Sequence, residues 1–319
     1  MLPSTLRKLK WRIKRASNLH RSSGQPDIAI FSSPRSGSTW LMEIVATQPG
    51  FKSINEPFLM TRFEGLTRPL SPNWELLLPG AERETILERY FASLLNNELG
   101  IGSPSPFMPQ HRWRTDRMVF KILRCKDMIN WFEEKFGLKV IFLLRHPLAV
   151  SLSRKACPQL RGFLDNDVYC DRYLTPALRR YGNEVLEEGT ELDRKILDWC
   201  LQHRPPLLHL DRSRWLCLHY EDLTMRPQEC IGKLAAFLEL DGVERMDRQL
   251  GVPSRSTFLS DRATRRHLKR NHSGTDPRFL VEKWRDRVDP EEERQSMEIV
   301  KTFGLDQYRL GDAMPHRRL

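Results

Sequence analysis

One segment near the amino terminus limits the possible folds of this chain more than any other. Residues 28–31 form the continuous apolar run Ile-Ala-Ile-Phe, which is typical of a strand buried on both faces of a parallel sheet. A turn-rich segment follows at 32–37, and apolar residues then recur at positions 40, 41, 44 and 45 with helical spacing. A strand, a glycine-containing loop and a helix in this order predict the opening unit of a nucleotide-type α/β fold.

The rest of the chain continues this alternation. Further apolar runs predict strands at 118–123, 139–144 and 215–218, and helical patterns occur at 81–97, 128–136, 193–203 and 227–238. A last helix is bracketed by Asp289 as N-cap, Pro290 in the first turn and Gly304 past its end. We therefore expect α/β class and a single P-loop-like three-layer domain over residues 27–319, with a mostly parallel sheet flanked by helices.

The charge of the chain is concentrated in two short segments. The 319 residues include 52 Lys and Arg against 41 Asp and Glu, a formal net charge of +11. Residues 1–26 carry seven basic side chains and no acid, and residues 261–270 carry five basic side chains and one acid. These two segments account for the whole excess, so the fold between them is neutral on balance.

Residues 1–26 are predicted to form a basic N-terminal arm. Leu6, Leu9 and Ile13 recur there at near-helical spacing among lysines and arginines. The favoured interpretation is a solvated or frayed terminus, with membrane-surface association and organelle targeting as alternatives. The chain has no run of 18 apolar residues and the arm lacks a secretory apolar core, so we expect a cytoplasmic protein without a transmembrane segment.

The six cysteines do not indicate a metal site. They are scattered, with no C-x-x-C pair and no histidines at metal spacing. No metal ligand is therefore predicted, and a disulfide scaffold is not expected at this length, although one or two bridges remain open.

The loop at 33–40, Ser-Pro-Arg-Ser-Gly-Ser-Thr-Trp, has the chemistry of an anion site. Backbone N–H groups at a helix N-terminus bind anions, and Gly37 lets the backbone approach an anion closely. Arg35 supplies a planar fork of donors, and Trp40 offers a face on which a base can stack. No lysine follows the glycine, so this is not a Walker A loop, and it is not G-x-G-x-x-G either. The alternative is a tight strand–helix turn capped by serine.

A second element lies at 145–154, where Arg-His-Pro-Leu-Ala-Val-Ser-Leu-Ser-Arg begins at the end of an apolar strand. Ligands of open α/β sheets collect at this carboxyl edge. Arg145 at the strand end and Ser153 two helical turns on are positioned to address one phosphate.

Together the two elements resemble the sulfotransferase superfamily. Residues 33–40 are similar to its 5′-phosphosulfate loop, and 145–153 are similar to its 3′-phosphate motif, with an arginine and a serine eight residues later. The segments Asn-Glu-Pro-Phe at 55–58 and Tyr-Glu-Asp-Leu at 220–223 also resemble family segments, so the likeness spans about 28–308. Arg35, where cytosolic small-molecule members carry lysine, favours the carbohydrate and tyrosylprotein branches, and the Glu-Pro step at 56–57 resembles the carbohydrate type. The second motif departs from the usual Arg-Asp-Pro-Arg, because it has His146 and Leu148.

The resemblance implies an enzyme that moves a sulfuryl group from 3′-phosphoadenosine 5′-phosphosulfate (PAPS) to a hydroxyl of a saccharide or small molecule, by in-line displacement without metal. It implies Arg35 and Glu56 as catalytic residues, with Glu56 as general base; the alternative for Glu56 is that it only terminates a strand. His111 is the second candidate base, and Lys121 is expected to face the site. The donor-binding residues implied are Arg35, Ser36, Gly37, Ser38, Thr39, Trp40, Arg145, Ser153 and Tyr220.

The sequence is also compatible with two other classes of protein. The first alternative is a P-loop-type nucleotide-binding kinase, which would need ATP and Mg²⁺. The second is an inert nucleic-acid-binding module that uses the two basic segments, although we expect no nucleic-acid partner. Three alternatives apply to residues 262–270. They cover the donor nucleotide, bind an acidic acceptor, or form a solvated helix face. The sequence does not indicate the oligomeric state.

Overall fold

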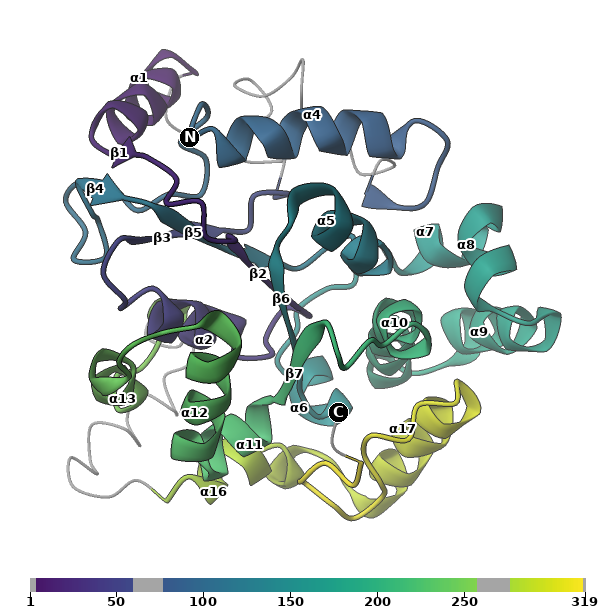
Figure 1. The fold of residues 1–319 in the computed structure, drawn as a ribbon. Helices are drawn as coiled ribbons and strands as arrows, with labels where there is room; N and C mark the ends of the chain where they lie inside the picture. The colour runs from purple at the N-terminus through teal and green to yellow at the C-terminus, as the bar shows by residue number, and fades with distance from the viewer. Residues whose placement is uncertain (1–3, 60–76, 257–275, 318–319) are drawn as a thin grey trace.

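The computed structural model describes residues 4–59, 77–256 and 276–317, and its centre is a five-stranded sheet (Figure 1). The strand order is β3-β5-β2-β6-β7, and every neighbouring pair is parallel. The prediction of an α/β fold with a parallel sheet is confirmed. The strands are β2 (Ile28–Ser32), β3 (Phe51–Asn55), β5 (Arg117–Ile122), β6 (Lys139–Leu144) and β7 (Trp215–His219).

Helices cover both faces of this sheet (Figure 1). In β2, Ile28 and Ile30 pack with the residues of one helical layer, whereas Ala29 and Phe31 pack with those of the other. All four side chains are fully buried, as the continuous apolar run requires. The first layer contains α2 (Ser38–Val45), α12 (Pro227–Leu238) and α13 (Glu244–Leu250), and the second contains α4 (Arg83–Leu95), α5 (Ile129–Phe136) and α10 (Glu191–Leu208).

The capping signals of the last helix, α17 (Pro290–Thr302), are confirmed. Asp289 accepts backbone hydrogen bonds from the first turn and forms a capping box with Glu292, and Gly304 follows the helix with a φ of 70°. By contrast, α10 is longer than its predicted span, since it continues through Pro205 and Pro206. Further helices of the domain are η3 (Lys126–Met128), α6 (Pro147–Ser151), α7 (Leu160–Asp165), α8 (Asp167–Tyr173), α9 (Pro176–Glu188), α11 (Tyr220–Met225), α16 (Arg278–Glu282) and η4 (Arg285–Arg287).

The described part of the N-terminal arm is a helix that is attached to the domain. In α1 (Ser4–Ala16), Trp11 packs against the core and the buried Lys14 donates a hydrogen bond to the carbonyl of Ser103. After the helix, β1 (Leu19–His20) pairs in parallel with β4 (Arg114–Thr115). The interpretation of residues 4–16 as a frayed terminus is therefore wrong, because the ring of Trp11 and the aliphatic stem of Lys14 pack against the domain.

None of the helices in residues 4–59, 77–256 and 276–317 is long and apolar enough to span a membrane. Within the same ranges, no group of three or more His, Cys, Asp or Glu side chains is arranged to hold a metal ion. All six cysteines lie in these ranges and are free thiols.

Candidate active site

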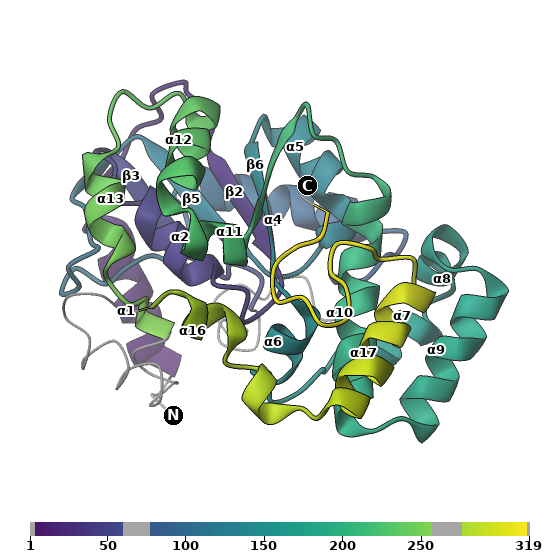
Figure 2. The ribbon, with the colours of Figure 1, turned by 90° about the horizontal axis from the view of Figure 1, so that it is seen from below.

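Four of the site residues predicted from the sequence lie just after the carboxyl ends of four strands. Arg35 comes after β2, Glu56 after β3, Arg145 after β6 and Tyr220 after β7. Because the strands are parallel and in register, these positions fall on one edge of the sheet. Figure 2 shows α6, α11 and α16 gathered at this end of the molecule. β2 lies at the centre of the sheet, so the loop that follows it reaches partners on both sides.

The loop after β2 has the backbone of an anion-binding concavity. Arg35 has a φ of 72° and Gly37 a φ of 85°, so two residues in three adopt the left-handed conformation just before α2. Such alternation turns successive N–H groups toward one point. A Cβ on Gly37 would lie 2.4 Å from a ring carbon of Tyr220, so only glycine fits here. The buried hydroxyl of Ser36 has no hydrogen-bond partner among the described residues.

Arg145 ties the end of β6 to this loop and to Tyr220. Its Nη1 donates to the carbonyl of Arg35 at 3.0 Å, and its guanidinium carbon lies 3.9 Å from the centroid of the Tyr220 ring. The Tyr220 ring in turn meets Trp40 edge-on, with centroids 6.2 Å apart. Nη2 donates to the carbonyl of Leu280 in α16, whereas Nε has no hydrogen-bond partner within the described segments. The structure thus brings Arg35, Gly37, Trp40, Arg145 and Tyr220 into one contiguous set.

Ser153 is less directly connected to this set. It lies in the turn after α6, and its hydroxyl donates to the carbonyl of Ala149 at 2.9 Å. Binding an anion through this hydroxyl requires it to turn away from that carbonyl. The next residue, Arg154, is buried and paired with Asp198 of α10, which fixes the backbone of this turn.

A buried lysine links the loop to Glu56. Lys121 Nζ lies 3.0 Å from Oγ1 of Thr39 in the first turn of α2 and 2.8 Å from Oε1 of Glu56. Burial lowers the pKa of Lys121, and the neighbouring carboxylate of Glu56 opposes that shift. The Lys121 ammonium therefore depends on Glu56 for compensation of its charge. In the sequence, the position of Lys121 inside an apolar strand is the feature that indicates this contact.

Glu56 itself stands in a strained backbone conformation. Its φ is 51°, although it is neither glycine nor asparagine, and such a conformation costs on the order of 1–3 kcal/mol. The side chain is 23% exposed, so it reaches both Lys121 and the surface of the site. Strain of this kind persists where the surroundings impose it, which makes Glu56 a candidate for function.

His111, the second candidate base, faces a different part of the molecule. Its Nε2 lies 3.0 Å from the carbonyl of Ser17, and its ring meets Trp113 edge-on. It lines a small pocket together with Lys14 and with Lys52 of β3. Lys52 lies four residues before Glu56, or roughly 13 Å along an extended strand.

Residues 262–270, the second basic segment, lie outside the described residues.

His146 explains how the chain tolerates its departure from the usual second motif. The ring is fully buried, stacked on Trp284 at 4.5 Å and in edge contact with Tyr308. Glu221 accepts hydrogen bonds from the His146 N–H at 3.0 Å and from the Tyr308 hydroxyl at 2.8 Å. Position 146 is thus the centre of a buried aromatic cluster that the sequence did not reveal, since its members lie more than 70 residues apart from it.

This burial predicts a defined pH dependence of stability. Burial, with nearby Arg285 and Arg145, lowers the pKa of His146 from 6.5 to about 3. The unfolded chain therefore takes up a proton there between pH 6.5 and 3 while the folded chain does not, so stability is lost as the pH falls through that window. His146→Phe keeps the stacking on Trp284 and should flatten this loss, as measured by urea unfolding at a series of pH values. His316→Phe, at an exposed position, is the matched control; equal pH slopes for all three proteins would refute the assignment.

Comparison with known proteins shows the family of the chain. A family model described as "Sulfotransferase domain" matches residues 25–309. No curated protein matches the chain. Among solved structures, the sulfotransferase domain of the Synechococcus olefin synthase is 22% identical, with 92% of this chain and 98% of that chain covered and a TM-score of 0.48. A mouse sulfotransferase complexed with PAP is 17% identical, with coverage of 88% and 86% and a TM-score of 0.46. The family match spans most of the chain and does not favour the kinase alternative: the chain belongs to the sulfotransferase family, and it is a sulfotransferase enzyme.

Proposed function

We propose that this sulfotransferase uses PAPS as its donor and a carbohydrate-type hydroxyl as its acceptor. The observation that supports the proposal is the contiguous set formed by the left-handed loop at Arg35 and Gly37, the guanidinium of Arg145 and the rings of Tyr220 and Trp40. It combines backbone donors for one phosphate, a cation for a second, and aromatic faces for a base. A donor with a 5′-phosphosulfate, a 3′-phosphate and an adenine matches all three.

Each donor-site residue has one task in this scheme. The N–H groups around Ser36 and Gly37 and the hydroxyls of Ser38 and Thr39 hold the 5′-phosphate. Arg35 neutralises the charge that develops on the leaving phosphate oxygen. Arg145 and Ser153 bind the 3′-phosphate. Trp40 and Tyr220 contact the adenine.

Glu56 serves as the general base. An S–O bond forms to the acceptor oxygen while the S–O bond to the 5′-phosphate breaks, which leaves 3′,5′-ADP, and the acceptor proton passes to the Glu56 carboxylate. Lys121 acts as a positioning residue, because its ammonium holds the Glu56 carboxylate and the Thr39 hydroxyl at the same time. It thereby connects the base to the loop that holds the donor.

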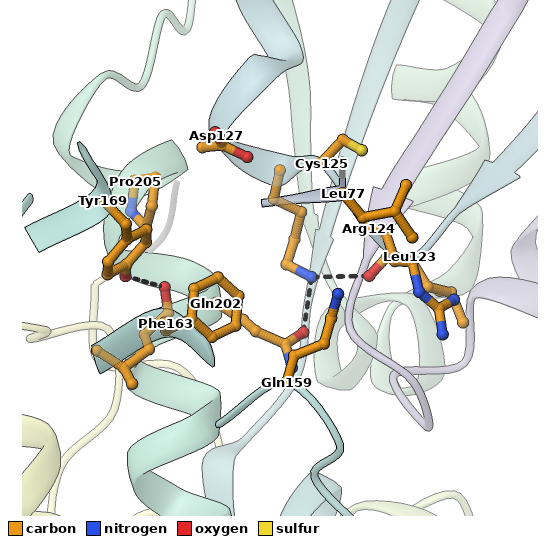
Figure 3. A pocket seen from close by; sticks show the side chains of 12 residues that line it. Leu77, Leu123, Arg124, Cys125, Asp127, Gln159, Phe163, Tyr169, Gln202 and Pro205 are labelled. Atoms are coloured by element: carbon orange, nitrogen blue, oxygen red, sulfur yellow. Dashed lines mark hydrogen bonds between the residues drawn. The ribbon is translucent and has the colours of Figure 1, made fainter. Parts of the chain in front are cut away.

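We propose that the acceptor binds at the mouth of the small pocket of Figure 3, which lies where β5 ends. Lys126, which is buried, donates to Oε1 of Gln202 at 2.8 Å and to the carbonyl of Leu123 at 3.0 Å. Gln202 also accepts from the hydroxyl of Ser33 in the donor loop at 3.4 Å, so the pocket adjoins that loop. Amide and cationic side chains in its lining suit a hydroxyl-rich acceptor with an acidic group; the polar members are Arg124, Lys126, Asp127, Gln159 and Gln202.

The experiment is transfer of labelled sulfuryl from PAPS to matched acceptors: a methyl glucoside, the corresponding methyl glucuronide and a simple phenol. We expect transfer to the saccharides, with kcat/KM about tenfold higher for the glucuronide, the effect of one charge-assisted hydrogen bond. Burial lowers the pKa of Lys126 to about 7, so this preference should be larger at pH 6, where the ammonium is charged, than at pH 8.

Lys126→Met should abolish the preference for the glucuronide while leaving transfer to the glucoside within about twofold. Transfer to the phenol alone would refute the saccharide acceptor but leave PAPS as the donor. Failure of every acceptor, together with no binding of 3′,5′-ADP, would refute the donor as well.

A further inference from the structure

The helix α1 turns an apolar stripe away from the protein. Leu6, Leu9 and Ile13 are 49%, 52% and 46% exposed, and at about 100° per residue they fall within roughly 60° of one another around the helix. Trp11 and Lys14, on the opposite side, are the residues that attach α1 to the domain. The stripe is therefore held in place on a folded body and faces solvent.

Cations surround this stripe, and no acid offsets them. Lys10 and Arg12 flank it on either side, and Lys8 and Arg15 are exposed on the side of the helix that carries Trp11. The helix contains no acidic residue, and in the part of the chain that the structure describes none of these four cations forms a salt bridge. An apolar stripe between unpaired cations is the pattern of a helix that lies in the interface of an anionic membrane.

Exposed aromatic side chains adjoin the helix on the same part of the protein. The loop beneath α1 begins at Ser103, which Lys14 binds, and runs to Trp113, whose carbonyl accepts from the N–H of Leu19 at 2.7 Å. In this loop Phe107 is 91% exposed and Trp113 is 66% exposed, and Leu19 is 52% exposed. Large exposed apolar groups gathered in one region mark an interaction surface.

We infer that α1 and the loop at 103–113 form a docking surface for anionic lipid membranes. The cations of α1 meet lipid headgroups, Leu6, Leu9 and Ile13 enter the boundary with the acyl chains, and the neighbouring loop adds further exposed apolar side chains. A nucleic-acid backbone would use the cations but would leave this apolar area in water, which is why a membrane fits better. The inference is independent of the donor and acceptor proposed above.

The test is sedimentation of the full chain with vesicles of phosphatidylcholine alone and of phosphatidylcholine mixed with phosphatidylserine. We expect at least tenfold stronger binding to the mixed vesicles, weakened by salt. The double substitution Leu9→Glu with Ile13→Glu should reduce it by about tenfold or more. The matched control is Leu208→Glu with Leu310→Glu, at residues 51% and 53% exposed elsewhere, which should bind like the wild type.

Three results would overturn the inference: no preference of the wild-type chain for mixed vesicles, equal binding by the Leu9 and Ile13 variant, or equal losses in that variant and the control. Tight binding to duplex DNA that Lys10→Glu with Arg12→Glu abolishes, but the apolar variant retains, would assign the surface to nucleic acid instead. Should the glutamate variant unfold, Leu9→Gln with Ile13→Gln carries the same expectation, and thermal unfolding of each protein confirms that it is folded.

Discussion

Glu56→Gln is expected to lower kcat by about 10²- to 10⁴-fold while changing the affinity for 3′,5′-ADP by less than about twofold. The amide keeps the size of the side chain and still offers an oxygen to Lys121, so the contact of Lys121 with the loop at Thr39 survives. What is lost is the ability to take the acceptor proton. Steady-state transfer assays give kcat, and calorimetric titration gives the nucleotide affinity.

The matched control is Glu133→Gln. Glu133 is also a partly buried, ion-paired glutamate, at 15% side-chain exposure and 3.0 Å from Arg214, but it lies on α5. We expect it to leave kcat within about twofold. If Glu56→Gln instead weakens nucleotide binding as much as it lowers kcat, Glu56 only neutralises Lys121 and ends β3.

Arg145→Ala should weaken 3′,5′-ADP binding by roughly 10- to 100-fold, since a hydrogen bond to a charged group contributes about 1.5–3 kcal/mol. Binding of 5′-ADP, which lacks the 3′-phosphate, should change much less. Ser153→Ala should act in the same direction with a smaller effect, because a hydroxyl carries no charge. Calorimetric titration of both nucleotides into each variant measures this.

Comparing the affinities for the two nucleotides distinguishes binding of the 3′-phosphate by Arg145 from support of the donor loop by the same residue. Arg145 also donates to the carbonyl of Arg35 and packs on Tyr220, so its loss can loosen the donor loop. Equal losses for 3′,5′-ADP and 5′-ADP would mean that Arg145 supports the loop rather than binding the 3′-phosphate. The control is Arg214→Ala, which should leave both affinities unchanged, because Arg214 precedes the amino end of β7 and pairs with Glu133 and Glu134 of α5.

The sheet was predictable where the strands are buried on both faces. The apolar runs of β2, β5 and β6 carry their own signal, because nearly every residue packs against a helix layer. β3 was not among the elements that the apolar pattern predicted. It lies at the edge of the sheet, and its sequence Phe-Lys-Ser-Ile-Asn contains Lys52, whose ammonium pairs with Asn97 instead of reaching solvent directly.

The site was predictable where local motifs determine it. The loop at 33–40 and the segment from Arg145 to Ser153 each lie next to a strand, so their placement at one edge follows from the parallel topology. Contacts between distant segments were not predictable. The enclosure of His146 by Trp284 and Tyr308, and the attachment of α1 through Trp11, depend on packing that leaves no periodic trace in the sequence.

One measurement tests the central claim, that this carboxyl edge binds a donor with phosphates at the 3′ and 5′ positions. It is the thermal shift of the wild-type chain with 3′,5′-ADP, with 5′-ADP, and with ATP and Mg²⁺, each with and without EDTA. We expect the largest stabilisation by 3′,5′-ADP, unchanged by EDTA. Greater stabilisation by ATP with Mg²⁺, abolished by EDTA, would contradict it.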